Sequence, residues 1–135
     1  MNTDAQNFLK RFSTKKDALT ALSLLAGYDE KYQSIKEQIE QHEDDDLAQR
    51  VMDYFNEVYG KNYQNTEKIQ SIIRQMPKVR FEQFQSIILH KQETWGKDDK
   101  MKPYLRPATL FGSKQKFITY LEDATDFWIQ KQKRQ

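Results

Sequence analysis

The sequence has no cysteine and, in 135 residues, only four glycines, three prolines and two histidines. Without cysteine the chain has no disulfide, no thiol nucleophile and no thiolate ligand for zinc, and a reducing cytoplasm is the simplest setting. No apolar run approaches the roughly 20 residues that span a bilayer, and the N-terminus lacks the apolar stretch of a secretory signal. With a mean hydropathy of −0.96, the composition predicts a cytoplasmic protein with no membrane contact.

Because helix breakers are scarce and strong helix formers such as Gln, Lys, Glu and Leu are common, the sequence predicts an all-α fold. We expect a single compact domain of about five to six helices, with an ordered proline-containing loop before the last one. Apolar spacing places these helices from Ser13 or Thr14 to Gly27, over Tyr28–Ile39, from about residue 46 to Gly60, from Thr66 to Pro77, over Phe81–Trp95 and from about Ser113.

The net charge of +2 conceals an uneven distribution. Residues 1–50 carry 7 basic and 10 acidic side chains, whereas residues 96–135 carry 9 basic and 5 acidic ones. We interpret 1–45 as an acidic helical extension, 46–130 as a helical module and 131–135 as a basic tail. The acidic run His42–Asp46 lacks the spacing of a calcium loop, so it predicts a solvated linker and the start of a helix.

No catalytic motif is recognisable, and we expect neither an enzyme nor a bound cofactor or metal. His42 and His90 lack metal-ligand spacing and are expected at the surface or at a rim, while Asp98 and Asp99 are expected to form a turn. Lys91 falls on an apolar helix line, which requires it to lie at the rim or to snorkel.

Residues 96–112 form the most irregular segment, and we expect Tyr104, Leu105, Leu110 and Phe111 to attach it to the domain. Basic side chains on and near this segment could neutralise phosphates, and an exposed ring could stack on an unpaired base. The alternative is that Tyr104 is buried, Arg106 holds the loop and the lysines only keep it soluble. The candidate nucleic-acid-binding residues are Lys61, Lys97, Lys100, Lys102, Tyr104, Arg106, Lys114 and Lys116.

Several short motifs occur in a suggestive order: Val51–Glu57, Gly60–Tyr63, Phe84–Trp95 and, most specifically, Tyr104–Gly112, followed by Phe117 and Tyr120-Leu121. Together they resemble the conserved C-terminal domain of phage replisome organisers, over about residues 51–121. These are phage and prophage replication-initiation proteins, similar in style to the DnaD-like primosome proteins of Gram-positive bacteria. In that family the domain follows a DNA-binding domain, usually of winged-helix type, for which the acidic helical residues before the match leave too little room.

The resemblance implies a non-enzymatic phage or mobile-element replication protein that binds DNA, single-stranded or nonspecifically, and assists replisome assembly in a bacterial host. A second hypothesis is an adaptor or inhibitor that binds a helicase, a helicase loader or an initiator. Tyr28 and Tyr32 are its candidate anchors, since aromatic side chains commonly anchor interfaces. Self-association into a homo-oligomer through the N-terminal amphipathic helices is a third hypothesis.

Overall fold

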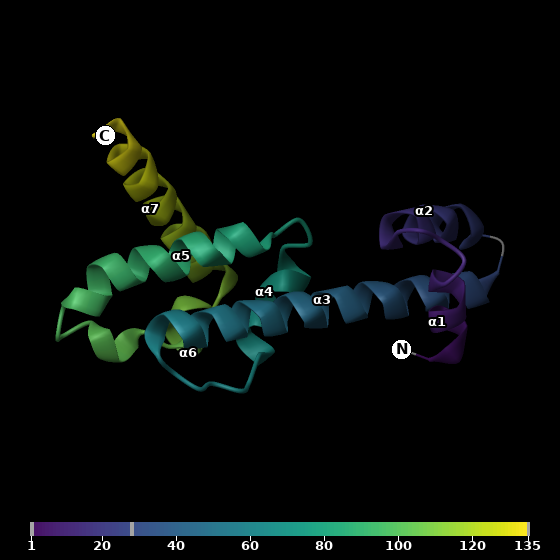
Figure 1. Ribbon diagram of the computed structural model, residues 1–135, viewed down its shortest axis with the longest axis horizontal. Helices are drawn as coiled ribbons and strands as arrows, with labels where there is room; N and C mark the ends of the chain where they lie inside the picture. Colours follow the sequence, from purple (N-terminus) through teal and green to yellow (C-terminus); the bar gives the residue numbers. More distant parts are fainter. Residues whose placement is uncertain (1, 28, 135) are drawn as a thin grey trace. The chain divides into compact units, whose positions relative to one another are not determined.

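The computed structural model describes residues 2–27 and 29–134, and within them the chain forms helices and turns with no strand. The all-α fold is therefore confirmed. The helices are α1 (Thr3–Leu9), α2 (Lys15–Leu25), α3 (Glu30–Tyr59), α4 (Glu67–Gln75), α5 (Phe81–Thr94), α6 (Pro107–Leu110) and α7 (Lys114–Lys133). Two 3₁₀ turns, η1 (Trp95–Lys97) and η2 (Lys102–Tyr104), lie between α5 and α6 (Figure 1). The chain divides into two compact units, Met1–Asp46 and Leu47–Gln135.

Side-chain caps fix where several helices begin. The Thr14 hydroxyl, one of the two predicted starting points, accepts a hydrogen bond from the Asp17 amide (3.1 Å) and begins α2. The Ser113 hydroxyl likewise accepts from the Lys116 amide (3.1 Å) and begins α7. Such caps satisfy backbone amides that the first helical turn leaves without partners. Helix α1, which begins with a cap from Asn2, is not among the predicted elements.

The predicted break at His42–Asp46 is wrong, because α3 continues through the acidic run as one helix of 30 residues. Contacts between side chains one helical turn apart stabilise the acidic residues within α3. The Gln41 amide donates to Asp45 (3.0 Å), and His42 Nδ1 lies 3.3 Å from Asp46 Oδ2. The helix ends where predicted, since Gly60 follows it with a φ of +63°, a conformation that glycine adopts without steric cost.

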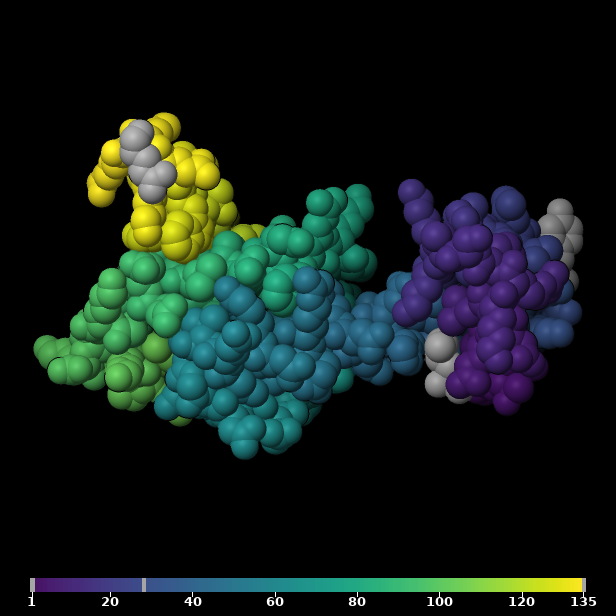
Figure 2. Space-filling view, in the orientation of Figure 1, coloured from purple at the N-terminus to yellow at the C-terminus, as the bar shows by residue number. Residues whose placement is uncertain are grey.

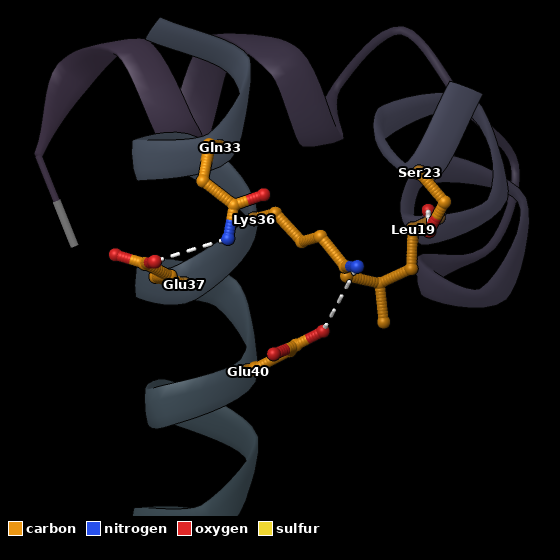
Figure 3. A network of polar contacts seen from close by, with 6 residues as sticks. All are labelled: Leu19, Ser23, Gln33, Lys36, Glu37 and Glu40. Carbon is orange, nitrogen blue, oxygen red and sulfur yellow. Dashed lines mark hydrogen bonds and ion pairs between the residues drawn. The ribbon is translucent and has the colours of Figure 1, made fainter. Parts of the chain in front are cut away.

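The first unit has a small core of its own, in which α1, α2 and the start of α3 contribute apolar side chains. Its buried members are Ala5, Phe8, Ala18, Leu22, Ile35 and Ile39. On its surface, Lys36 of α3 extends past Leu19 of α2 and ends 4.0 Å from Glu40 (Figure 3).

The second unit has the larger core, to which α3, α4, α5, α6 and α7 all contribute. Helix α5 lies beside the second half of α3 (Figure 1), and the Tyr59 hydroxyl donates to the Ile88 carbonyl between them. Burial of Tyr59 raises its pKa far above the ordinary value for tyrosine. Helix α7 packs against α5, and the Trp128 indole donates to the Ser86 carbonyl (3.3 Å). Residues 129–134 are exposed, and α7 continues through Lys133, so the expected basic tail begins inside this helix.

Candidate nucleic-acid interface

The segment between α5 and α7 is an ordered series of turns held mainly by its own backbone. The Asp98 carbonyl accepts hydrogen bonds from the amides of Met101 (3.0 Å) and Lys102 (2.8 Å). The Asp98 carboxylate accepts from the Lys100 amide (2.9 Å). Asp98 is therefore a turn former, as its position in a lysine-rich loop predicts. These bonds present the intervening lysines on a defined backbone.

Three apolar side chains attach the segment to the core. Leu105, Leu110 and Phe111 are buried, as predicted. The Phe111 ring lies 5.3 Å from Phe84 and 6.3 Å from Phe55, centroid to centroid, in edge-to-face geometries that favour aromatic pairs. Tyr104 does not join them, since 45% of it is exposed. The expectation that Tyr104 attaches the loop is wrong, and its ring is free to contact a ligand.

All the candidate cations are exposed. Lys97 is paired, with its ammonium 3.3 Å from Glu93. The Arg106 side chain donates to the Thr109 hydroxyl (3.2 Å), and its guanidinium lies 5.9 Å from the Tyr104 ring centroid. Over residues 2–27 and 29–134, the remaining candidates form no ion pair with an acidic side chain: Lys61, Lys100, Lys102, Lys114 and Lys116.

The turn from α6 into α7 requires a glycine. A Cβ atom built on Gly112 would collide with the Ala108 carbonyl oxygen, at a separation closer than such atoms reach in proteins. The close approach lets α7 begin at Lys114 directly after α6. This turn therefore places Lys114 and Lys116 beside the Tyr104–Gly112 segment.

Lys61 belongs to a second turn, which packs on the same rings. The Asn56 side chain accepts a hydrogen bond from the Tyr63 amide and donates to the Tyr63 carbonyl, both at 2.9 Å. The Tyr63 ring, 37% exposed, lies 5.8 Å from Phe55, which in turn contacts Phe111. Both basic segments are thus attached to one aromatic cluster.

One cation of this surface was not predicted. Lys78, in the turn between α4 and α5, lines an apolar groove of about 400 Å³ together with Lys114. The groove also contains Met76, Pro77 and Val79. The charge density along the sequence gives no signal for Lys78, because Lys114 lies far along the chain and joins it only in the fold.

The candidate partner anchors, Tyr28 and Tyr32, belong to the first unit. Tyr28 lies outside the described residues. Tyr32 is half-buried against Phe8, with ring centroids 6.3 Å apart, so only part of its side chain can reach a partner. The prominent apolar side chain of this unit is instead Leu24, which is 73% exposed. The sequence indicates this exposure, because Leu24 lies off the apolar line of α2.

His90 and Lys91 are buried, contrary to the expected rim positions. The His90 ring lies 4.7 Å from Phe127, and its pKa is lowered by burial and by Lys91, while Asp123 opposes the shift. Lys91 points its ammonium at the rings of Trp95 and Tyr120, 4.4 Å from each centroid. Burial lowers the pKa of Lys91, and Asp123 partly offsets this.

Among the described residues, no group of three or more acidic or histidine side chains is arranged to hold a metal ion. In that same part of the chain, no helix combines the length and apolarity needed to cross a bilayer.

Comparison with known families places part of the chain. The family described as a conserved phage C-terminus matches residues 51–122, which is just over half of the chain. The match starts within α3 and includes the α6 turn and the first part of α7. No curated protein and no solved structure shows significant similarity to the chain. The protein thus belongs to the conserved phage C-terminus family.

Proposed function

We propose that this protein is a non-enzymatic DNA-binding protein that assists replication of a phage or mobile element. The observation that carries the proposal is the set of exposed, unpaired cations around the Tyr104–Gly112 segment. The unit that contains them, Leu47–Gln135, has 16 basic and 10 acidic side chains. Membership of a phage family agrees with this role, and the resemblance to replisome organisers supplies the link to replication.

The mechanism is electrostatic, with a contribution from stacking. Cations of this surface neutralise phosphates and release counterions, so affinity falls steeply with salt. They are Lys100, Lys102, Arg106 and Lys114. Tyr104 and Tyr63 are partly exposed, and unpaired bases stack on their rings at about 1–3 kcal/mol per base. Because backbone bonds already order the loop, little entropy is lost when it binds. The expected ligand is single-stranded DNA, bound without sequence preference.

The test measures binding of labelled single- and double-stranded oligonucleotides over a salt series. Replacing Lys102, Arg106 and Lys114 by alanine removes three phosphate contacts and lowers the single-strand salt slope by about 2. A matched control replaces Lys10, Lys15 and Lys16, three exposed lysines of the first unit, and leaves the slope unchanged. Absence of binding at about 50 mM salt, or equal effects of the two triple variants, would refute the proposal.

The second candidate is an adaptor that contacts a helicase, a helicase loader or an initiator. Its support is the first unit, Met1–Asp46, which has 6 basic and 10 acidic side chains and an exposed Leu24. Binding to each purified candidate protein, with nuclease present, tests it directly. If Leu24 is the anchor, Leu24→Ser abolishes this binding. Leu19→Ser cannot serve as the control, because Leu19 packs on the core.

A further inference from the structure

A groove of about 610 Å³ lies between α5 and the C-terminal half of α7, away from the proposed DNA-binding loop in sequence. His90 and Glu93 of α5 form one side of it. The other side is one face of α7, with Asp123, Asp126, Phe127, Gln130, Lys131 and Arg134. Figure 2 shows the end of α7, in yellow, standing clear of the rest of its unit, and Ile129 there is 44% exposed.

The charges on this face are segregated along the helix. Asp123 and Asp126 lie at the N-terminal end of this face, and Lys131 and Arg134 lie at its C-terminal end. Within the described ranges neither aspartate forms an ion pair. A uniformly acidic or uniformly basic ligand would be repelled by half of the groove. The partner that matches both halves is one with the same charges in reverse order.

We propose that the groove holds the α7 helix of a second copy of this chain, antiparallel to the first, in a two-fold symmetric dimer. If the symmetry axis passes between Trp128 and Ile129, Asp123 faces Arg134 of the other copy. The same axis brings Asp126 opposite Lys131. All four charges that line the groove from α7 are thereby paired in one register. At a rise of 1.5 Å per residue, each charged residue lies about 8 Å or less from the symmetry axis, measured along the helix.

The centre of the same register is uncharged and contains an aromatic ring from each copy. Phe127 lies opposite Gln130 of the other copy, and the Phe127 ring is supported from behind by His90. Because burial and Lys91 lower the pKa of His90, its ring carries no charge at neutral pH that would repel the incoming Lys131 and Arg134. A symmetric dimer requires such a self-complementary surface, and interfaces place apolar side chains at their centre with charges around them.

The first measurement is sedimentation equilibrium at about 5 to 500 µM protein, a range that covers weak dimers. The average mass rises from monomer toward dimer. A mass that stays monomeric over the whole range overturns the proposal.

Charge variants then test the register. Asp123→Lys with Asp126→Lys makes the face wholly basic, and Lys131→Glu with Arg134→Glu makes it wholly acidic. Each variant alone loses dimer affinity at least tenfold, whereas a mixture of the two associates as a heterodimer. The matched control, Glu122→Lys with Lys133→Glu, alters charges on the same helix away from the groove and changes affinity less than threefold. Circular dichroism confirms that each variant remains helical. Failure of the two variants to associate on mixing, or an equal loss in the control, refutes the register.

Crosslinking gives an independent measurement, because the chain has no cysteine. Gln130→Cys lies close to the axis and forms an intermolecular disulfide under mild oxidation. Thr125→Cys, exposed on another face of α7, forms at least tenfold less. Equal crosslinking at the two positions contradicts the proposed geometry. None of these substitutions touches the candidate DNA-binding residues, so this proposal and the proposed function can fail separately.

Discussion

Replacing Lys91 by methionine is expected to stabilise the protein at neutral pH, by about 1 kcal/mol. Two effects oppose each other at this position. The ammonium gains attraction from the faces of Trp95 and Tyr120, a contribution of about 0.5–2 kcal/mol in total. It loses hydration, since only 5% of the residue is exposed. The lowered pKa of Lys91 decides between them, because it means that the folded protein favours the uncharged amine more than water does.

Methionine keeps most of the packing. Its chain has nearly the length of the lysine stem, and a thioether beside an aromatic ring contributes about 0.3–1.5 kcal/mol. Lys91→Ala is the matched comparison, since it also removes the charge but leaves a cavity beside the two rings. We expect Lys91→Ala to lower the free energy of unfolding by about 2 kcal/mol.

The assay is urea unfolding of the three proteins between about pH 7 and pH 10.5. In this range the unfolded lysine, with an ordinary pKa of 10.5, holds more protons than the folded one. The wild-type protein therefore gains stability relative to Lys91→Met as pH rises through the folded pKa toward 10.5, and the advantage of methionine shrinks. A methionine variant that is less stable by more than about 0.5 kcal/mol at pH 7, or a pH-independent difference, would show that the ring contacts outweigh burial.

Gly112→Ala is expected to lower the free energy of unfolding by about 1–3 kcal/mol in urea, because its Cβ meets the Ala108 carbonyl; an unchanged midpoint would contradict the tight turn. Tyr59→Phe leaves the buried Ile88 carbonyl without its side-chain donor and should cost about 1 kcal/mol by the same assay; equal stability of the two proteins would contradict it. Since burial lowers the pKa of His90, unfolded His90 binds its proton first, and wild-type stability falls as pH drops below about 6.5; thermal unfolding of His90→Phe should show a smaller fall, and an equal fall would refute this assignment.

Helix ends and buried stripes were the most predictable features of this chain. Local chemistry alone places helix ends at Ser13 or Thr14, near Ser113 and at Gly60, because caps and left-handed glycines act on their immediate neighbours. The apolar lines of α4 and α5 also place Ile72 and Phe84 in the core, as their spacing predicts.

The wrong predictions concern the acidic run in α3, the short helix α1 and the buried Lys91. No glycine or proline occurs between Gly27 and Gly60, so nothing in the backbone stops α3 at the acidic run. Helix α1 was missed because its buried side chains, Ala5 and Phe8, are too few to form a periodic pattern. The burial of Lys91 depends on Trp95 and on Tyr120 of another helix, which no local pattern brings together.

The sequence predicts only part of the candidate site. Exposure of its lysines follows from their hydration, and the anchoring roles of Leu105 and Phe111 follow from their size. The position of Tyr104 could not be predicted, since a half-apolar ring in a loop is equally suited to core or surface. Its exposure depends on η2, where Tyr104 closes a 3₁₀ turn, a feature set by backbone bonds rather than by hydrophobicity.

The family match is shorter than the core that it belongs to. It begins at Val51 and ends at Glu122, yet Ala48 and Ala124 are fully buried in the same cluster as Phe55, and Trp128 packs against that cluster. The α3 turn before the match and the α7 turns after it are therefore part of the folding unit, because removing them would expose Phe55 and its neighbours to water. Residues 51–122 carry the shared sequence features, whereas the packing that positions the basic loop requires both flanking helix segments.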